Sequence, residues 1–287
     1  MSSKTASRTV PVCCMPTGEH AWVGFDDDDA RWDLRAEFAR TGLARGEQVF
    51  FFTDAATTPD RAVERLRACG LPAGAALAEG RIGVVNGAPG YDPVTGFDPA
   101  ARARTWVDVT ERARRQGFTG ARAMGDMSWA ALPGVDHSVL VDYEAGLTPL
   151  FAEIGFTAVC EYDRREFDDA ALGQVCGAHP VRVLERLGAL DITATARELR
   201  IAGEADLTTR EEFDSALTRA LTGSAPLTTV DLSALCFMDV HSAALLVHLA
   251  SRLARTTLLE VRCRPRQLKL LRFCGAAQVP QLLLSEG

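Results

Sequence analysis

The sequence lacks several features that mark large classes of proteins. It has no run of about 18 consecutive apolar residues, and its N-terminal stretch lacks the apolar segment of a secretory signal. Lysine is almost absent: the chain has 29 arginines and two lysines, no basic cluster stands out, and the formal net charge is −7. These absences argue against a membrane protein, an exported protein and direct binding of nucleic acid. We therefore expect a cytoplasmic protein.

The eight cysteines lack the spacing of a metal site or of a disulfide framework. None of them forms a CxxC pair, so we expect neither a zinc site nor a set of disulfides. The adjacent Cys13 and Cys14 are either buried thiols or a redox-active pair. The acidic run 26–29 either begins a helix or binds a divalent metal. Because consecutive side chains point in different directions, we predict no metal site there.

What the chain does contain is the composition of a folded protein, with 47% hydrophobic and 24% charged residues among its 287 residues. In the first part, strand-like segments alternate with helical ones, which predicts βαβ units, a mostly parallel sheet and a ligand rim at the strand ends. The strands are expected at 46–54, 80–87, 121–130 and 156–163. The helices are expected near 28–44, 59–69, 98–116, 137–154 and 166–178.

The pattern changes after His179 and Pro180, which places a domain boundary near 181–189. The remaining residues predict a smaller α/β unit that begins with two strands around a turn, within 190–206. Helices are then expected at 210–223, 240–255 and 266–275, and strands at 228–235, 257–264 and the final 279–284.

The stretch VDLSALCFMDVHSAALL, residues 230–246, together with the GE and AD dipeptides of 203–206, resembles the STAS domain of anti-anti-sigma factors. The resemblance covers about 189–287. The family pattern is DLS, three residues, then F-I/M-D-S-S/T-G before an apolar helix, and its phosphorylated hydroxyl is the second residue after the aspartate. His241 occupies that position here, and Ser242 replaces the usual glycine.

The resemblance implies that Ser233, Asp239, His241 and Ser242 lie on a regulatory surface that binds a partner. Asp239 is expected to cap the helix, and a negative group in the following turn would be favoured by the helix dipole while it changes the charge of the surface. His241 is then a retained exposed residue, a partner contact or a pH-responsive group. Ser242 is an alternative phosphoacceptor, although one step along a helix rotates a side chain by about 100°.

The first part of the chain resembles a sensory domain first described in methanogens and methylotrophs and abbreviated MEDS. The match spans about 15–180 and implies a relationship to RecA/KaiC-like folds and a role in sensing small molecules or signals. It rests on segments whose order matches the family: His20, Phe25, 40–54, Tyr91, GFDP at 96–99, GDMSWA at 125–130, YEAGL at 143–147, CEYDRREF at 160–167 and HP at 179–180.

Nucleotide hydrolysis by a RecA-like domain would require a phosphate-binding loop, GxxxxGK[ST]. The candidate place at 16–25 has glycine at one of the two required positions and no lysine. Glu19 and His20 lie in that segment, where either a ligand contact or a structural hydrogen bond is expected of them. Asp126 and Glu144 either line the same pocket or pair with Arg122 or another arginine.

Together these observations predict an α/β protein: a RecA/KaiC-like, mostly parallel sheet with flanking helices at 15–180, a linker at 181–188 and a STAS domain at 189–287. We expect a bacterial, non-enzymatic signalling regulator without catalytic residues, which binds an anti-sigma factor of the GHKL kinase type, or a related regulator, by partner switching. A small molecule bound by the first domain and a homo-oligomer are further partners that the sequence allows; no cofactor is assigned. The alternatives are an enzyme with nucleotide-dependent or hydrolytic activity that the STAS domain regulates, and a scaffold protein.

Overall fold

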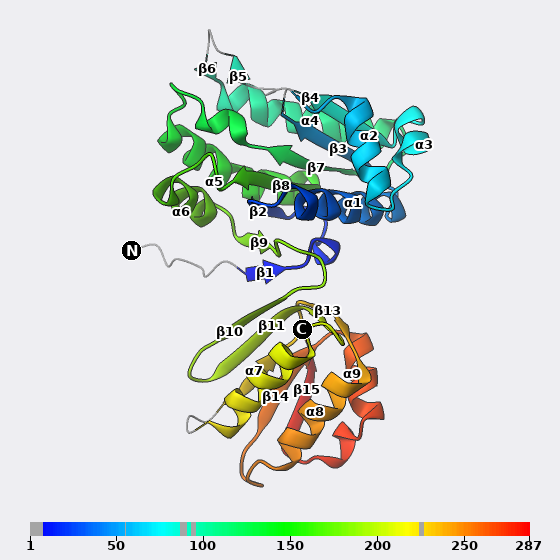
Figure 1. Cartoon of the computed structure of the whole chain (residues 1–287), viewed down its shortest axis with the longest axis vertical. Coiled ribbons are helices and arrows are strands. Elements are labelled where there is room, and N and C mark those ends of the chain that lie inside the picture. The colour runs from blue at the N-terminus through cyan, green and yellow to red at the C-terminus, as the bar shows by residue number, and fades with distance from the viewer. Residues whose placement is uncertain (1–7, 55, 87–90, 93–95, 224–226) are drawn as a thin grey trace. The chain divides into compact units, whose positions relative to one another are not determined.

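The structure is a computed structural model that describes residues 8–54, 56–86, 91–92, 96–223 and 227–287. The chain divides into two compact units (Figure 1). Unit 1 consists of Met1–Arg8 and Met15–Arg186, and unit 2 consists of Thr9–Cys14 and Leu187–Gly287. The short segment before Met15 therefore belongs with the C-terminal part of the chain, which the sequence did not indicate.

Unit 1 is built on six parallel strands in the order β9-β2-β8-β7-β3-β4. These strands are β2 (His20–Phe25), β3 (Gln48–Thr53), β4 (Ile82–Asn86), β7 (Ala121–Asp126), β8 (Phe156–Asp163) and β9 (Val181–Val183). The strand β1 (Arg8–Val10) crosses the boundary of the two units, because Arg8 belongs to unit 1 and Thr9 and Val10 belong to unit 2. A short antiparallel pair, β5 (Tyr91–Asp92) and β6 (Gly96–Phe97), stands apart from this sheet.

Helices flank the sheet of unit 1 in two groups, which confirms the α/β architecture expected from the sequence (Figure 1). The first group is α1 (Asp28–Ala44), α2 (Pro59–Ala68) and α3 (Ala73–Ala78), and the second is α4 (Pro99–Arg115), α5 (His137–Ile154) and α6 (Asp169–Ala178). Five of these helices begin after a side chain that accepts a backbone N–H of the first turn: Asp27, Thr58, Asp98, Asp136 and Asp168.

Three predicted segments of unit 1 differ from the observed ones. The linker expected at 181–188 begins with β9, which pairs with β2, and unit 1 extends to Arg186. The strand expected at 121–130 ends at Asp126 and continues as a 3-10 helix, Ser128–Ala131. Residues 20–25 were interpreted as part of a loop, but they form β2. All six residues of β2 are buried, because the strand lies inside a parallel sheet that is covered on both faces. Such a strand shows no alternation of polar and apolar residues.

Unit 2 holds a second sheet in the order β10-β11-β12-β14-β15, with β13 paired to β11. Only the β10–β11 pair is antiparallel among the described pairs of this sheet. The strands are β10 (Leu190–Ala194), β11 (Glu198–Ala205), β12 (Thr229–Asp231), β13 (Leu235–Met238), β14 (Leu259–Cys263) and β15 (Leu282–Glu286). The helices are α7 (Arg210–Thr222), α8 (Val240–Ser251) and α9 (Pro265–Phe273), with 3-10 turns at Val12–Cys14 and Ala276–Gln278.

A bulge in β11 and a turn between β12 and β13 shape the edge of unit 2 from which α8 starts. The pairing of β11 with β13 shifts between Gly203 and Glu204. Gly203 has φ +112°, and a Cβ there would lie 1.9 Å from the carbonyl oxygen of Ala189, so only glycine fits. The strand expected at 228–235 is split, because the Asp231 side chain accepts the backbone N–H of Ser233 and turns the chain.

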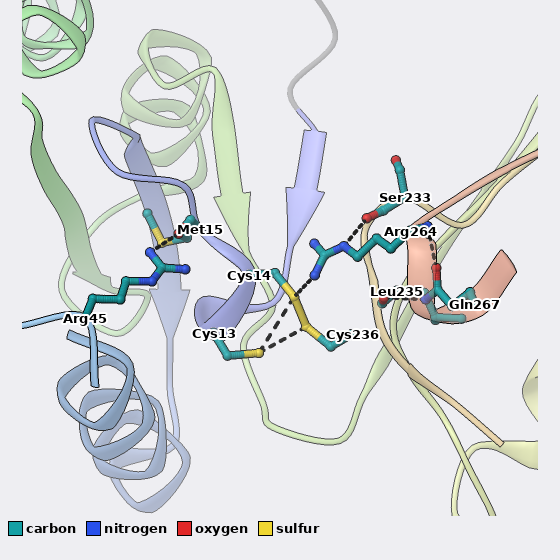
Figure 2. The surroundings of a disulfide bond; sticks show 9 residues. All are labelled: Cys13, Cys14, Met15, Arg45, Ser233, Leu235, Cys236, Arg264 and Gln267. Carbon is teal, nitrogen blue, oxygen red and sulfur yellow. Dashed lines mark hydrogen bonds between the residues drawn. A yellow bond between two sulfur atoms is a disulfide. The ribbon is translucent and has the colours of Figure 1, made fainter. Parts of the chain in front are cut away.

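Cys14 and Cys236 form a disulfide within unit 2 (Figure 2). The expectation that the sequence carries no disulfide is therefore wrong, because 222 residues separate the two cysteines and no local spacing announces the pair. The sulfur of Cys13 lies 3.0 Å from that of Cys236. Disulfides persist mainly in oxidising compartments, so this bond and the expected cytoplasmic location point in different directions.

No helix in the described part of the chain has the length and apolar character needed to cross a membrane.

Candidate functional site

Four buried side chains from separate elements of unit 1 meet between the sheet and the helices. His20 is the first residue of β2, Glu144 lies in α5, Cys160 lies in β8, and His179 directly follows α6. Cys160 is two residues beyond Ala158, the register partner of His20, so His20 and Cys160 share one face of the sheet. The four side chains are between 0% and 8% exposed. We call them the His–Glu–Cys–His cluster.

Glu144 lies at the centre of the cluster. Its Oε2 is 3.1 Å from Nε2 of His20 and 3.4 Å from Nε2 of His179. The sulfur of Cys160 is 3.4 Å from Nε2 of His20 and 3.5 Å from Oε2 of Glu144. One atom from each of the four residues thus lies within 4.8 Å of every other.

The outward-facing atoms of the cluster are held by a second set of contacts. Nδ1 of His179 lies 2.7 Å from the carbonyl oxygen of Val175, and Nδ1 of His20 lies 3.2 Å from the hydroxyl of Thr148. Tyr162 donates its hydroxyl to Oε1 of Glu144 at 3.0 Å. These contacts turn Nε2 of both imidazole rings and Oε2 of the carboxylate toward one another.

Burial sets the ionisation of the cluster. Desolvation and the neighbouring His179 lower the pKa of His20 to about 4, although Glu144 opposes this shift. Desolvation acts to raise the pKa of Glu144, but the neighbouring His179 and His20 outweigh it, and the pKa falls below its usual value. Burial and Glu144 raise the pKa of Cys160 well above its usual value. At neutral pH, the metal-free cluster therefore holds a neutral His20, an anionic Glu144 and a Cys160 thiol.

A cavity with a volume of about 40 Å³ adjoins this cluster, and one water molecule requires roughly 10–15 Å³. Its walls are mostly aromatic and aliphatic, with Glu144 and Cys160 among the polar residues. Arg102 also lines it, with its guanidinium 4.1 Å from the ring centroid of Trp106. Burial lowers the pKa of Arg102, and within the described residues Arg102 forms no ion pair. Asp126 and Glu144 both line this cavity, as one of the sequence alternatives proposed, so it combines an apolar wall with the Arg102 cation and two carboxylates.

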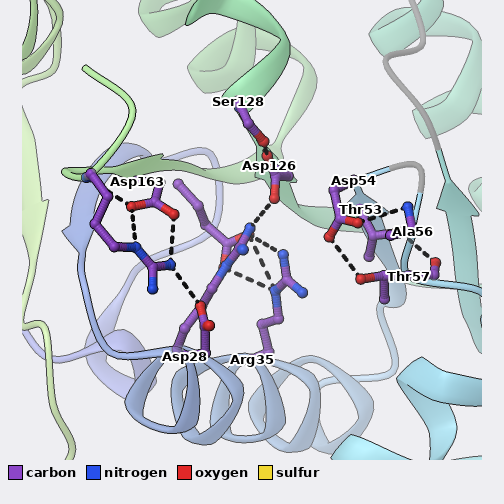
Figure 3. Close-up of polar contacts among 12 residues, drawn as sticks. Asp28, Arg35, Thr53, Asp54, Ala56, Thr57, Asp126, Ser128 and Asp163 are labelled. Atoms are coloured by element: carbon purple, nitrogen blue, oxygen red, sulfur yellow. Dashed lines mark hydrogen bonds and ion pairs between the residues drawn. The ribbon is translucent and has the colours of Figure 1, made fainter.

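A buried network of charges lies where the strands of unit 1 end (Figure 3). Arg31 contacts Asp126 at 2.5 Å and Glu161 at 3.0 Å, and Arg35 binds both carboxylate oxygens of Glu161. Asp126 also accepts a hydrogen bond from Ser128. Burial acts to raise the pKa values of Asp126 and Glu161, but the arginines hold both below their usual range. Asp126 thus pairs with Arg31 rather than with Arg122, whose partner is Glu47.

The connection from β2 to α1 corrects the placement of the phosphate-loop candidate. This connection consists of Asp26 and Asp27, not of residues 16–25, because 20–25 is the strand itself. The Asp27 side chain accepts the backbone N–H groups of Asp29 and Ala30 at the start of α1. A helix N-terminus binds a phosphate through such N–H groups, and here an aspartate occupies them beside further carboxylates. Glu19 lies apart from this connection and pairs with Arg8 at 2.6 Å.

In unit 2, the residues singled out from the sequence gather at the start of α8. Asp239 caps the helix and accepts the backbone N–H of Ser242 at 2.8 Å, while Arg210 contacts its other oxygen at 3.2 Å. His241 is exposed, with Nε2 2.9 Å from Asp214. Ser242 is fully buried, so its hydroxyl is not exposed to a partner or a kinase in this conformation. Ser233 is partly buried, and its carbonyl accepts a hydrogen bond from Arg264.

Exposed apolar side chains lie on either side of this helix start. Phe237 at the end of β13 is 51% exposed and Val240 at the start of α8 is 58% exposed. Cys274, which follows α9, reaches the carbonyl oxygen of Val240, and its neighbour Phe273 is 85% exposed. Large exposed apolar side chains are typical of a protein-binding surface when they lie close together. We call Phe237, Val240, His241 and Phe273 the α8 surface.

Comparison with known families identifies the family of the domain that forms unit 1. Residues 19–180 match MEDS, the methanogen/methylotroph DcmR sensory domain, over more than half of the chain. The chain belongs to the MEDS family. The MEDS match contains all four residues of the His–Glu–Cys–His cluster, and the resemblance noted in the sequence over about 15–180 is confirmed.

Two further comparisons extend the description of this MEDS protein. Similar solved structures include a KaiC-like protein of Pyrococcus horikoshii, with 15% identity, a TM-score of 0.43, and coverage of 65% of this chain and 77% of that one. Another is the flagellar accessory protein FlaH of Methanocaldococcus jannaschii, with 12% identity, a TM-score of 0.44, and coverage of 66% and 80%. No curated protein sequence matches the chain.

The cluster was only partly visible in the sequence. His20 and Glu144 were candidates, but Cys160 and His179 were not assigned a role, and no metal site was predicted. The four residues are too far apart in the chain to show a ligand spacing, because the fold of the sheet brings them together. The available signal was that each one lies within a segment of the MEDS resemblance: His20, 143–147, 160–167 and 179–180.

Proposed function

We propose that this MEDS protein is a non-enzymatic signalling regulator of the cytoplasm. Its MEDS domain binds a small molecule in the cavity beside the His–Glu–Cys–His cluster. Its unit 2 acts as a STAS domain and binds an anti-sigma factor of the GHKL kinase type, or a related regulator, through the α8 surface. The observation that carries the proposal is the aromatic cavity within a domain of a sensory family.

The walls of the cavity indicate the class of ligand. Aromatic rings of Phe52, Trp106 and Trp129 surround it, and such walls favour an apolar body. Arg102 adds a cation without a carboxylate partner, which favours one acceptor or negative group on the ligand. Because the volume is about 40 Å³, the ligand is a molecule of a few non-hydrogen atoms, such as a short-chain carboxylate or a polar hydrocarbon derivative.

The topology of unit 2 supports the assignment of its role. Two antiparallel strands precede α7, and parallel strands then alternate with α8 and α9, which is the order expected of a STAS domain. The segment FMDVHS, 237–242, forms the end of β13 and the first turn of α8. This is the place where the STAS pattern carries its regulatory hydroxyl.

His241 gives this regulator an altered switch. The hydroxyl position of the STAS pattern holds an exposed imidazole, and the nearest hydroxyl, that of Ser242, belongs to a buried residue. We therefore expect a serine kinase partner to leave unit 2 unphosphorylated, and the MEDS domain to supply the regulation. A His241→Ser variant should become a substrate if the partner kinase still recognises the α8 surface.

The start of α1 favours a non-enzymatic role over the alternative of a nucleotide-dependent enzyme. Four aspartates at 26–29 lie where a RecA-like domain would bind phosphates, and like charges repel. Purified full-length protein with Mg²⁺ and ATP should show no turnover above buffer. Hydrolysis that is lost in an Arg31→Met variant would instead support the enzyme alternative.

The partner assignment can be tested by capture with the full-length chain. Val240→Arg places a charge in the α8 surface and should abolish capture of an anti-sigma factor, identified by mass spectrometry. The matched control is Leu258→Arg, because Leu258 is 66% exposed and precedes β14, at the edge of the parallel sheet opposite to the start of α8. Capture of a metabolic enzyme, or equal loss in both variants, would contradict the assignment.

The ligand assignment can be tested by thermal shift of the full-length chain against short-chain carboxylates and polar hydrocarbon derivatives. A compound that stabilises the wild type should lose its effect in Arg102→Met. Arg104→Met is the matched control, because Arg104 lies on the same helix and is exposed. A compound whose effect survives Arg102→Met, or disappears in Arg104→Met as well, does not bind in this cavity.

A further inference from the structure

The His–Glu–Cys–His cluster brings two imidazole nitrogens, a carboxylate oxygen and a thiol sulfur together in a fully buried place. We propose that His20, Glu144, Cys160 and His179 bind one divalent transition-metal ion, with Zn²⁺ the preferred ion. This site would lie in the MEDS domain, and it does not depend on the proposed ligand or on the role of unit 2.

The distances within the cluster are those of a tetrahedral metal site. Zinc bonds nitrogen and oxygen at about 2.0–2.2 Å and sulfur at about 2.3 Å, so neighbouring ligand atoms lie roughly 3.3–3.7 Å apart. The observed separations from His20 to Glu144, from His179 to Glu144, from His20 to Cys160 and from Cys160 to Glu144 are 3.1, 3.4, 3.4 and 3.5 Å. These four separations are compatible with ligand atoms around one ion, and the two remaining pairs of atoms lie within 4.8 Å of each other.

The orientation of His179 points to an ion rather than to a hydrogen bond. Its Nδ1 donates to the carbonyl oxygen of Val175, so a neutral His179 carries its lone pair on Nε2. That atom is buried without a hydrogen-bond partner among the described residues and faces Oε2 of Glu144. Two acceptors that face each other are unfavourable unless a proton or a cation lies between them. A metal ion satisfies both.

The ligand set also balances its charge. Zn²⁺ with the Glu144 carboxylate, a Cys160 thiolate and two neutral imidazoles has no net charge, which suits a site from which water is excluded. Thr148, Val175 and Tyr162 would fix the ligands from behind, as the outer partners of metal-binding histidines and carboxylates do. Sulfur and nitrogen ligands favour Zn²⁺ over Mg²⁺ and Ca²⁺.

The neighbouring cavity provides the route to the site. Glu144 and Cys160 both belong to its walls, so an ion could enter from this side without unfolding of the sheet. A small molecule in the cavity would then lie next to the metal.

The test uses the full-length chain, first stripped of metal with a chelator and then titrated with Co²⁺. We expect one equivalent to bind, with visible bands of tetrahedral Co²⁺ and a near-ultraviolet thiolate-to-cobalt band, and Zn²⁺ to displace it. Cys160→Ser should abolish the thiolate band. Thr148→Val, which removes an outer contact of His20, should lower the affinity for Zn²⁺ by about 10- to 100-fold.

A second group of three sulfurs supplies the control. Cys13, Cys14 and Cys236 also lie close together, so Cys13→Ser should leave the thiolate band unchanged. X-ray absorption of the zinc-loaded wild type does not depend on the folding of any variant and should show one sulfur and three nitrogen or oxygen neighbours. Absence of Co²⁺ binding by the folded chain, loss of the band in Cys13→Ser alone, or a zinc environment rich in sulfur would each overturn the proposal.

Discussion

Every charged side chain that is buried among the described residues lies in unit 1, whereas the buried polar side chains of unit 2 are uncharged. Unit 1 buries arginines, aspartates, glutamates and two histidines between its parallel strands and helices. Unit 2 buries only Thr209, Ser242, Gln267 and Gln281 among its polar residues, and its remaining core is apolar. Both units are α/β, but among the described residues only unit 1 has charged side chains in its interior.

The difference indicates where each unit acts. Removing a charge from water costs several kcal/mol unless a partner offsets it, so buried charges are a burden that a stable core does not need. The buried charges of unit 1 lie at the strand ends and around its cavity, where an internal site is expected. Unit 2 has an apolar core, and its exposed apolar side chains include those of the α8 surface.

The largest expected effect comes from removing a charge that two cations share. Glu161→Gln would leave Arg31 and Arg35 buried with a weaker acceptor, and we expect a loss of about 3–5 kcal/mol in the free energy of unfolding of unit 1. Denaturant unfolding followed by hydrogen exchange in β8 would measure it. Glu260→Gln, at an exposed pair in unit 2, should leave unfolding unchanged. A small effect of Glu161→Gln would mean that the buried network is not needed for stability.

A second prediction concerns whether the buried pair of Arg122 and Glu47, at 2.5 Å, contributes as a pair. Arg122→Met alone should cost about 3–5 kcal/mol, because it leaves a buried carboxylate without a partner. Adding Glu47→Met should recover much of that loss, since neither charge is then buried. Denaturation of the two single variants and the double variant completes the cycle. Additive losses would contradict the interpretation.

Unit 2 should respond instead to the loss of apolar volume. Leu246 in α8 is fully buried, and Leu246→Ala should lower the free energy of unfolding by about 2–5 kcal/mol. Leu258→Ala removes the same atoms from a residue that is 66% exposed and should change stability by less than about 0.5 kcal/mol. Equal effects of the two variants, measured by exchange in β14, would show that this core is not packed as described.

The smallest predicted effect separates the cap of α8 from its ion pair. Asp239→Ala removes the acceptor for the Ser242 N–H and should cost about 1 kcal/mol, within the range of about 0.5–2 kcal/mol for helix caps. Asp239→Asn keeps an acceptor but loses the charge beside Arg210, and should lower the free energy of unfolding by only a few tenths of a kcal/mol. If the two variants lose the same stability, the ion pair rather than the cap supports the helix start.

Much of the fold follows from local sequence patterns. The helices and most strands lie where apolar residues recur with the period of a helix or of a strand. Asp239 caps α8, as its position before an apolar run predicted. The strand β2 was not predicted, because its residues are buried on both faces of the sheet and do not alternate between polar and apolar. The segment 228–235 was interpreted as one strand because Val230, Leu232 and Ala234 continue the alternation of apolar and polar residues through the turn.

The candidate sites depend on contacts that local patterns do not record. His20 and Glu144 were noticed separately, and the meeting of β2, α5, β8 and the end of α6 is a property of the sheet order. The burial of Ser242 and the exposure of His241 follow from a rotation of one residue around α8, which the sequence allowed but could not assign without the packing of α7. The Cys14–Cys236 disulfide likewise could not be predicted from local patterns, because it joins two segments of unit 2 that lie far apart in the sequence.

The disulfide between Cys14 and Cys236 closes a covalent ring that contains Met15–Arg186 of unit 1 and residues 187–236 of unit 2. The chain passes through Cys14, continues through the whole of unit 1, and returns at Leu187 before it reaches Cys236. A protease that cuts once at the connection between Arg186 and Leu187 would therefore produce two fragments that remain joined. They would migrate as one species until a reductant is added, so a single cut in the backbone between the two units would not separate them.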